Sequence, residues 1–514
     1  MEYPPQLSPE HERDLLAIAS DYSLSHGLVL RPLSHSTTTS IHAPYSLYPS
    51  PFPRQLFEQA LRIQESYNRL YAKITTDDQF LERVVGGNVT KVDEFQRNLY
   101  RIWKQVKQEG VKQPISLGIF RSDYLVHAPQ NQSQETSPSL KQVEFNTISS
   151  SFGALSTRVS QLHQFLVESQ QYPSPHPYLS NPTSLPENEA LEGIAQGLVD
   201  AHYAYKNETG SKDARIMMVI QDNERNAFDQ RLLQWQVMEK HKVPLIRIPF
   251  SQLRTSLSLS PSNSALLYTP PTSSPSSPSA SPIEISLIYY RTAYSPSDYY
   301  TPHEWSTRLL IEQSLAIKCP SVAMQLAGCK KVQQVLSTPS ELERFIEGEE
   351  EREELRKSFV GLWGMEDGNE GEELARGEPE RFVLKPQREG GGNNIYRQDI
   401  PPFLSKLEEE DKTRGEGEVK GKEGYILMEL IEPPRGMTQV LVKAGEEEGR
   451  RADVVSELGI YGVMLLKEKK EEEGGGCEEL RNETVGHLLR TKGRESDEGG
   501  IAVGFSVLDS PVLV

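Results

Sequence analysis

The stretch Phe382-Val-Leu-Lys385-Pro-Gln-Arg-Glu389-Gly-Gly-Gly392-Asn-Asn-Ile-Tyr396 joins an apolar, strand-like run to three consecutive glycines. Glycines let a backbone approach a ligand closely, so that its amide N–H groups can surround phosphate oxygens. Lys385 adds positive charge, and Glu389 offers a carboxylate to a metal ion. The stretch therefore predicts a site for ATP.

Two familiar phosphate motifs do not fit this stretch. No Gly-Lys-[Ser/Thr] ends it, as a P-loop requires, and its glycines lack the spacing of a dinucleotide-binding fingerprint. A flexible surface hairpin would suit residues 390–394 equally well. The rest of the chain has to decide between a phosphate-binding loop and a hairpin.

The composition excludes several classes of protein. The 514 residues hold 73 Asp plus Glu against 55 Lys plus Arg, and the net charge of −18 argues against nucleic acid as the main partner. No apolar run approaches the length that crosses a bilayer, and no signal-like segment opens the sequence. The three cysteines lack metal-ligand spacing, which is typical of reduced thiols. We therefore expect a soluble, cytoplasmic protein of two or three domains.

The N-terminal part is expected to be mostly helical, because apolar residues recur at helical spacing over 9–33 and 53–110. Asp77 and Asp93 are suited to begin helices there.

Short apolar runs predict strands in the rest of the chain. The predicted strands are 115–119, 142–145, 216–220, 245–248, 283–288, 382–384, 425–429, 452–458 and 461–466. A helix over 230–240 between two of them indicates a separate α/β unit from about 215 to 290. Serine and proline dominate 251–281, which we expect to be disordered because it cannot bury enough apolar surface. The charge-rich connections 408–424 and 467–477 are expected to be flexible.

Glu144 and Asn146 lie two residues apart on a predicted strand, so their side chains share one face. Mg²⁺ prefers one or two carboxylates plus phosphate oxygens, and Glu389 can supply a further carboxylate. An ordinary exposed strand face would show the same pattern.

Several polar residues follow the ends of predicted strands and are suited to hold a small polar substrate. Arg121 can bind a carboxylate by two parallel hydrogen bonds, and Ser149–Ser151 offer hydroxyl groups. Residues 224–230 and 291–294 occupy strand ends of the α/β unit, where open sheets place ligands. Solvated side chains and helix caps remain the alternatives for all of these.

Further cations stand near glycines in the last third of the chain. Lys330, Arg490 and Lys492 are suited to neutralise phosphate charge. The glycine-rich segment 498–504 beside them resembles a lid.

Taken together, these motifs resemble one family. In chain order they are Arg121-Ser-Asp-Tyr, Glu144-Phe-Asn-Thr-Ile-Ser, Glu224-Arg-Asn, Phe228-Asp-Gln-Arg, Gln325-Leu-Ala-Gly, Lys385-Pro-Gln-Arg-Glu-Gly-Gly-Gly-Asn-Asn, Ser456-Glu-Leu-Gly and His487-Leu-Leu-Arg-Thr-Lys. From about Pro51 to Pro511 the chain is similar to the eukaryotic glutathione synthetases of the ATP-grasp superfamily.

The resemblance implies a mixed α+β and α/β architecture, an ATP-grasp fold with an inserted α/β substrate-binding domain and a helical N-terminal region. Residues 1–211 would hold the helical region and the metal and substrate strand 142–151. Residues 212–318 would form the inserted domain around the Ser/Pro-rich loop. Residues 319–514 would carry the glycine-rich loop 385–396 and the lid 493–504.

The resemblance also implies an activity, the ATP-dependent ligation of γ-glutamylcysteine to glycine through an acyl phosphate. Glutathione, ADP and phosphate would be the products, Mg²⁺ would be the cofactor, and the protein would be a homodimer. Phosphorylation would give the dipeptide carboxylate a leaving group that the amine of glycine can displace.

Position by position, the resemblance assigns residues to each role. The metal ligands would be Glu144, Asn146 and Glu389, and the catalytic residues Arg490, Lys385 and Glu389. The ATP site would comprise Glu144, Lys330, Lys385, Gly390, Gly391, Gly392, Asn393, Asn394, Tyr396, Met428, Glu429, Leu430, Ile431, Glu457, Lys492 and Glu498. The substrates would meet Arg121, Ser149, Ser150, Ser151, Glu224, Arg225, Asn226, Gln230, Arg291, Thr292, Ala293, Tyr294, Arg490, Ile501 and Ala502.

The chain departs from the family pattern at Leu430, where a lysine is common, at Glu498, where an aspartate is usual, and at Thr292-Ala293, which replaces Asp-Gly. Two other readings stay open. One is a ligase for a different small amino acid, β-alanine or serine, decided near Ile501-Ala502. The other is a non-catalytic relative that binds a thiol peptide, against which the complete set of cations argues.

Overall fold

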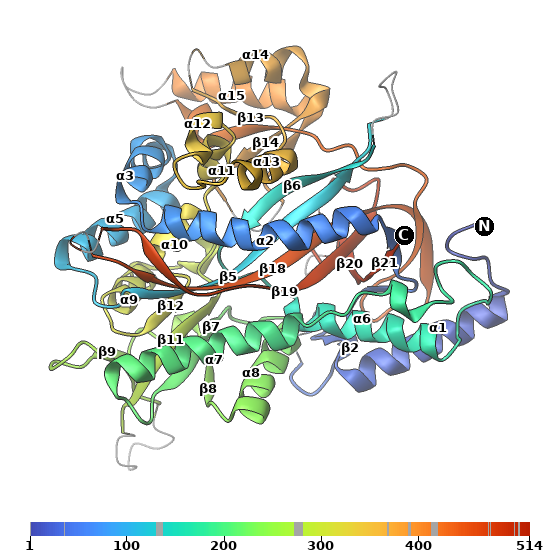
Figure 1. Ribbon diagram of the computed structural model, residues 1–514, viewed down its shortest axis with the longest axis horizontal. Helices are drawn as coiled ribbons and strands as arrows, with labels where there is room; N and C mark the ends of the chain where they lie inside the picture. Colours follow the sequence, from blue (N-terminus) through green and yellow to red (C-terminus); the bar gives the residue numbers. More distant parts are fainter. Residues whose placement is uncertain are drawn as a thin grey trace.

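The computed structural model describes residues 2–34, 36–129, 137–271, 281–366, 368, 370–388, 392–412, 420–470, 472, 474–497, 499–501 and 504–514. One large sheet runs across the molecule, with α2 over one face and α6 and α7 over the other (Figure 1). A smaller lobe with α14 and α15 stands at the top of that view. These elements confirm the mixed α/β class expected from the sequence.

The N-terminal part is helical, as the apolar spacing predicts. Its helices are α1 (Pro9–His26), α2 (Arg54–Thr75), α3 (Asp78–Leu81), α4 (Thr90–Val92) and α5 (Glu94–Glu109), with a π-helix over Glu82–Val89. Asp77 and Asp93 begin helices as predicted, because their carboxylates accept hydrogen bonds from the N–H groups of Phe80 and Gln96 at 2.9 and 2.8 Å.

The helices further along the chain cover both sheets. They are α6 (Gly153–Glu168), α7 (Ala190–Thr209), α8 (Ala227–His241), α9 (Pro302–Glu312), α10 (Val322–Ala327), α11 (Lys330–Leu336), α12 (Pro339–Leu342), α13 (Glu349–Ser358), α14 (Glu370–Gly377) and α15 (Ile400–Asp411). The apolar face of α2 packs against the large sheet through residues such as Phe57, Ile63 and Tyr67. Residues of α6 and α7, such as Leu155 and Leu198, form a second core on the opposite face.

The large sheet joins strands from the whole chain in the order β17-β3-β20-β19-β18-β5-β12-β11-β10-β9, with β6 paired to β5, and β7 and β8 continuing from β11. Their bounds are β3 (Tyr45–Ser46), β5 (Ile115–His127), β6 (Ser139–Asn146), β7 (Arg215–Ile220), β8 (Leu245–Pro249), β9 (Leu257–Leu259), β10 (Leu266–Tyr268), β11 (Ile283–Arg291), β12 (Ile317–Cys319), β17 (Thr438–Val442), β18 (Gly449–Glu468), β19 (Cys477–Gly493) and β20 (Ser506–Asp509). Short pairings of β1 (Val29–Leu30) with β2 (Ile41–His42) and of β4 (Ser50–Phe52) with β21 (Pro511–Leu513) lie outside this sheet.

A second, four-stranded sheet has the order β13-β16-β14-β15. Its strands are β13 (Leu362–Gly364), β14 (Phe382–Pro386), β15 (Ile395–Tyr396) and β16 (Tyr425–Glu429). Phe382, Leu384 and Leu427 form a small core with Ile400 and Leu404 of α15. The strand 382–384 that precedes the glycines is therefore present, and it carries Lys385.

The expected disorder of 251–281 is wrong in part, whereas the expected flexibility of 467–477 and 408–424 stays a prediction. Strands β9 and β10 lie within 251–281 in spite of the surrounding serines, because the leucines and Tyr268 of β10 pair with β11, and β9 pairs in turn with β10. Residues 272–280 lie outside the described residues. The connection 467–477 is flanked by paired strand, since Glu468 pairs with Cys477 at the end of the β18–β19 hairpin. The connection 408–424 begins with the last turn of α15 and ends in a 3₁₀ turn at Gly421–Gly424, while 413–419 lie outside the described residues.

The strands predicted over 452–458 and 461–466 are one strand, β18. Gly459, between the two predicted strands, does not form a turn. A Cβ atom at this position would lie 2.8 Å from Arg121 Cδ and 2.8 Å from Asp123 Oδ1, so the absence of a side chain lets two charged groups pack against the strand. The glycine therefore marks a close approach.

The strands of the α/β unit do not form a sheet of their own. The strands β8, β7, β11 and β12 are parallel, and β12 pairs in turn with β5. The large sheet thus continues across residue 318, and the three-domain division at 211 and 318 stays a prediction.

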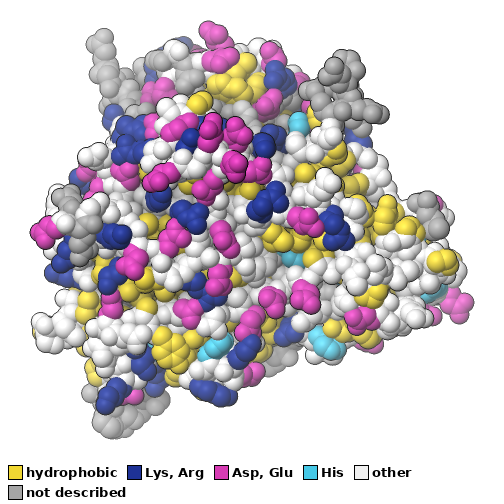
Figure 2. Space-filling model, viewed as in Figure 1, with side chains coloured by type: hydrophobic (Ala, Val, Ile, Leu, Met, Phe, Trp, Pro, Cys, Tyr) yellow, Lys and Arg dark blue, Asp and Glu magenta, His cyan; other side chains and the backbone are white. Residues whose placement is uncertain are grey.

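The surface carries charges of both signs. Figure 2 shows acidic and basic side chains interspersed over the face that α2 covers. None of the described helices is long and apolar enough to cross a membrane.

Candidate active site

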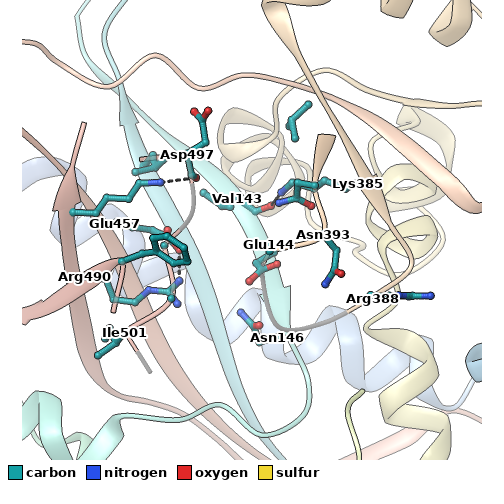
Figure 3. Close-up of a pocket in the computed structure, with 18 of the residues that line it drawn as sticks. Val143, Glu144, Asn146, Lys385, Arg388, Asn393, Glu457, Arg490, Asp497 and Ile501 are labelled. Atoms are coloured by element: carbon teal, nitrogen blue, oxygen red, sulfur yellow. Dashed lines mark hydrogen bonds and ion pairs between the residues drawn. The ribbon is translucent and has the colours of Figure 1, made fainter. Parts of the chain in front are cut away.

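A cavity of about 580 Å³ is lined by residues of both sheets. Figure 3 shows Glu457 and Arg490 on one side of it, Lys385 and Asn393 on the other, and Glu144 between them. The motifs that lie far apart in the sequence therefore meet around one space.

The register of the large sheet explains this meeting. Arg121 and Asp123 on β5 share a face, and their partners on β6 are Asn146 and Glu144. On the other side of β5, Asp123 pairs with Gly459 of β18. Glu457, two residues before Gly459 on β18, pairs with Arg490 of β19. Four neighbouring strands thus present their charged side chains on one face.

Most of the predicted site residues line this cavity. They are Arg121, Glu144, Asn146, Ser149, Ser150, Ser151, Glu224, Asn226, Arg291, Tyr294, Lys330, Lys385, Gly392, Asn393, Asn394, Tyr396, Met428, Glu429, Leu430, Ile431, Glu457, Arg490, Lys492 and Ile501. Glu389, Gly390, Gly391, Glu498 and Ala502 lie outside the described residues. The individual roles of these residues stay predictions.

Four predicted substrate residues do not reach the cavity wall. Gln230 donates to Glu224 at 3.1 Å, and the carbonyl of Thr292 accepts from Ser149 Oγ at 3.2 Å. The carbonyl of Ala293 accepts from the Gln325 amide at 2.9 Å. Arg225 instead donates from Nε to a backbone carbonyl at 3.4 Å. Gln230 and Thr292 thus contact residues that line the cavity, Glu224 and Ser149, without lining it themselves.

A buried network of charges forms the wall between β5 and β19. Arg121 donates to Asp123 through Nε at 2.6 Å and through Nη2 at 2.8 Å. Arg490 Nη2 also donates to Asp123, at 2.9 Å, and to Glu457. The Asn146 amide donates to the same Asp123 oxygen at 2.9 Å. The sequence reasoning did not single out Asp123, although its position two residues after Arg121 on a strand places both on one face.

A second group of charges surrounds Glu144. Lys330 Nζ lies 2.6 Å from Glu144 Oε2, and Lys385 Nζ donates to the backbone carbonyl of Val143 at 3.1 Å. Burial raises the pKa of the Glu144 carboxyl, but the charges of Lys330, Lys385 and Arg490 outweigh burial and hold that pKa well below its usual value. Glu144 is therefore a carboxylate at neutral pH.

The donor atoms here fit a hard cation. Glu144 supplies an ionised oxygen, and the Asn146 amide nitrogen points at two acceptors, Asp123 Oδ2 and the carbonyl of Arg121. The remaining Asn146 atom, Oδ1, is thus an oxygen acceptor. Two oxygen ligands suit Mg²⁺, which takes its other ligands from phosphates and water. No cluster of three Asp, Glu, His or Cys side chains able to hold a metal occurs among the described residues, to which Glu389 does not belong.

The end of the cavity near the α/β unit is arranged around Asp229. This carboxylate accepts from the N–H groups of Phe152 and Ala154 at 3.0 and 2.9 Å, at the start of α6, and from Arg291 Nη2 at 2.8 Å. Arg291 Nη1, Ser150 Oγ and Asn226 Oδ1 are buried and have no partner among the described residues. Donors and acceptors thus stand ready for a small polar ligand.

The part of the lining that belongs to the four-stranded sheet is apolar. Val383, Met428, Leu430 and Ile431 belong to one small apolar cluster on the four-stranded sheet. Such a surface suits the flat face of a purine base.

Several lining residues escaped the sequence reasoning. They include Val143, Gln221, Arg388, Arg397, Val455, Arg494 and Asp497. Arg388 stands inside the glycine-rich motif and Asp497 inside the predicted lid. Their positions in these motifs could have identified both as site residues. Gln221, which donates to Tyr294 at 3.1 Å, directly follows a predicted strand.

Comparison with known proteins gives one consistent result. A profile of the family described as eukaryotic glutathione synthase, ATP binding domain, matches residues 9–513. The chain is 36% identical to a glutathione synthetase of Xenopus laevis over 511 residues, which cover 98% of this chain and 97% of that protein. It is also 36% identical to a glutathione synthetase of Homo sapiens over 507 residues, again 98% and 97%.

A solved structure gives an independent comparison of the fold. The structure of a glutathione synthetase-like effector from Globodera pallida aligns with a TM-score of 0.73 at 23% identity, covering 99% of this chain and 98% of that one. That likeness concerns the fold alone. With the family profile, it confirms the predicted ATP-grasp class.

Proposed function

Because this chain belongs to the eukaryotic glutathione synthase family, we propose that its cavity joins γ-L-glutamyl-L-cysteine to glycine with Mg²⁺ and ATP. The full-length similarity supports a ligase that forms a carbon–nitrogen bond. The observation that carries the proposal is the meeting of Glu144, Lys330, Lys385 and Arg490 on one cavity, whose lining also holds an apolar cluster and several polar groups without a partner in the described part of the chain.

The reaction proceeds in two displacements. An oxygen of the dipeptide's cysteinyl carboxylate attacks the γ-phosphorus of ATP, and the bond to the ADP oxygen breaks. The glycine nitrogen then attacks the carbonyl carbon of the acyl phosphate, and phosphate leaves with the carboxylate oxygen. The amine proton passes to solvent, and the products are glutathione, ADP and phosphate.

The cations of the cavity stabilise the charge that spreads over the transferred phosphoryl group. The charges of Lys330 and Lys385 both act on Glu144, and Lys492 stands on β19 two residues after Arg490. Glu144 and Asn146 would hold Mg²⁺, which would supply positive charge against the phosphates of ATP.

The dipeptide lies at the polar end. We assign its carboxylate at the reacting end to Arg121 and Arg490, and its glutamyl part to Arg291, Ser150 and Asn226, whose unpaired atoms offer donors and an acceptor. The adenine lies against Met428 and Ile431, with Leu430 in place of the lysine common in the family.

The direct test is the substrate dependence of ADP release. ADP should appear at a rate well above background only when γ-glutamylcysteine and glycine are both present, and glutathione should accumulate in equal amount. No ADP release with both substrates present would contradict the proposal and favour a non-catalytic thiol-peptide-binding protein. ADP release at the same rate in the absence of both substrates would contradict it in another way, because it would indicate an ATPase and not a ligase.

A second acceptor is the main alternative, because one methylene or hydroxyl group changes binding only modestly. Glycine, β-alanine and serine should be compared at equal concentration. A higher kcat/KM for β-alanine or serine would reassign the acceptor and leave the rest of the mechanism in place.

Location and assembly are also proposals. We propose a cytoplasmic homodimer, as the family resemblance implies, and the three cysteines, which are thiols and not disulfides, fit a reducing compartment. Size-exclusion chromatography with light scattering would test the dimer.

A further inference from the structure

Asp123 is a fully buried carboxylate that does not line the cavity but contacts three groups that do. Its Oδ1 accepts from Arg121 Nε at 2.6 Å. Its Oδ2 accepts from Arg121 Nη2 at 2.8 Å, from Arg490 Nη2 at 2.9 Å and from the Asn146 amide at 2.9 Å. One carboxylate thus connects Arg121 of β5, Asn146 of β6 and Arg490 of β19.

The contact with Asn146 fixes the direction of its amide. Both neighbours of the Asn146 nitrogen, Asp123 Oδ2 and the carbonyl of Arg121, can only accept hydrogen bonds. The reverse orientation would place an oxygen against two oxygens. Asp123 therefore holds the Asn146 Oδ1 atom as the one available to a cation.

The backbone is adapted to this arrangement. Gly459 of β18 leaves the space that Arg121 and Asp123 occupy, since a Cβ atom there would lie 2.8 Å from each of their nearest atoms. A carboxylate that served only to balance Arg121 would not need the contacts with Arg490 and Asn146.

We propose that Asp123 is a positioning residue that holds Arg490, Arg121 and the Asn146 amide in their working orientations at once. The inference rests on the proposed function, because it assigns substrate contacts to the two arginines and a metal contact to Asn146. It predicts that a change at Asp123 weakens turnover and cation binding together, although Asp123 touches neither ligand.

The first variant is Asp123→Asn, which keeps the shape of the side chain and removes its charge. We expect kcat to fall by about 30-fold, and the dissociation constant for Mn²⁺ to rise by about tenfold, as is usual when a partner behind a ligand is lost. Mn²⁺ binding is measured by electron paramagnetic resonance with ATP present and the dipeptide absent, so this readout does not depend on turnover.

The matched control is Glu312→Gln. Glu312 forms an equally buried pair with Arg308, at 3.0 Å, within α9 and away from the cavity lining. It should lower the melting temperature, as removal of one partner of a buried pair does, yet leave kcat and Mn²⁺ binding unchanged. If both variants lower kcat and Mn²⁺ affinity alike, Asp123 acts through stability alone and the inference is wrong.

The second variant, Asn146→Asp, keeps the proposal testable if Asp123→Asn does not fold. A metal site defined by its ligands alone should gain affinity from an added carboxylate. The contact with Asp123 instead sets two carboxylates against each other, so we expect Mn²⁺ affinity to fall by about tenfold. Tighter binding than in the wild type would overturn the inference.

In the double variant Asp123→Asn/Asn146→Asp, the side chain at position 123 becomes the hydrogen-bond donor and the side chain at position 146 the acceptor. Its Mn²⁺ affinity should exceed that of Asn146→Asp by at least about threefold, because contacting residues are coupled. Additive losses would contradict the inference. Failure of the wild-type enzyme to release ADP would instead contradict the proposed function, while the Mn²⁺ measurements would still decide the role of Asp123.

Discussion

The two walls of the cavity hold their charges in different ways. On the wall built from the large sheet, two ion pairs are buried: the Arg291 and Asp229 side chains are 2% and 0% exposed, and those of Arg121 and Asp123 are 7% and 0% exposed. On the wall built from the four-stranded sheet and the residues around Asp497, ion pairs are open to water: the Arg397 and Asp497 side chains are 43% and 47% exposed. Arg381 and Glu429, beside the apolar cluster, are 53% and 38% exposed.

This difference in burial indicates that the two walls serve different functions. Buried charges keep one orientation and act strongly because little water screens them, so they suit the stabilisation of a charged transition state. Exposed pairs contribute little and rearrange readily, which suits a surface that must admit and release a nucleotide. Changes on the first wall should therefore cost far more activity than changes on the second.

The largest effect is expected at Lys330, whose neighbour Lys331 offers a matched control. Both are buried at the start of α11 and each pairs with a glutamate, but Lys330 faces Glu144 in the cavity and Lys331 faces Glu366 outside its lining. Lys330→Met should lower kcat/KM by about 1000-fold, because it removes a cation from the transferred phosphoryl group.

Lys331→Met should change kcat/KM by less than about threefold, while it lowers the melting temperature. Steady-state kinetics and thermal unfolding of both variants provide the check. Equal losses of activity would mean that the Lys330 effect comes from the fold.

Removal of the Glu144 charge should act mainly on the metal. Glu144→Gln keeps the side chain's shape, but its oxygen no longer carries the charge that the low pKa of Glu144 maintains. The Mg²⁺ concentration for half-maximal rate should rise by about 100-fold, since Mg²⁺ depends on carboxylate ligands. A Mg²⁺ titration of the rate that is unchanged from the wild type would remove Glu144 from the metal site.

At the polar end, Arg291→Lys should separate binding from turnover. Lysine keeps the charge but cannot bind Asp229 and a substrate group through a planar fork, so KM for the dipeptide should rise by about 30-fold. We expect kcat to change by less than about threefold.

Arg308→Lys is the control for this experiment, because it removes a buried arginine from a pair outside the cavity lining. It should leave KM for the dipeptide at the wild-type value. If Arg291→Lys lowers kcat and leaves KM alone, Arg291 belongs to the reacting centre and not to dipeptide binding.

The smallest effect is expected on the exposed wall, at Arg397. This residue has a φ of 48°, a conformation that glycine adopts without strain, and its pair with Asp497 is exposed. Arg397→Gly should therefore change KM for ATP by less than about threefold. A loss of tenfold or more would show that this wall also depends on fixed charges, and the comparison between the walls would fail.

The sequence was sufficient where a local pattern decides the structure. The strand that leads to Lys385 follows from its apolar run, and the common face of Glu144 and Asn146 follows from the alternation of side chains along a strand. Asp93 begins a helix because its short carboxylate reaches the N–H of Gln96. These features need no knowledge of distant residues.

It was insufficient where distant strands meet. The position of Asp123 between Arg121 and Arg490 depends on the register of β5 with β18 and of β18 with β19, which local patterns do not determine. Gly459 looked like an interruption between strands for the same reason, because the side chains that require a glycine there come from β5. In 251–281, average composition concealed the few apolar residues that pair with β11.

The central claim is that the buried wall activates a peptide carboxylate by phosphorylation. The most direct measurement uses γ-glutamylcysteine labelled with ¹⁸O in its cysteinyl carboxylate, followed by mass analysis of the phosphate released with ATP and glycine present. Each phosphate should carry one labelled oxygen, because the carboxylate oxygen leaves with it. Unlabelled phosphate released together with glutathione would contradict the acyl phosphate and the roles assigned to that wall.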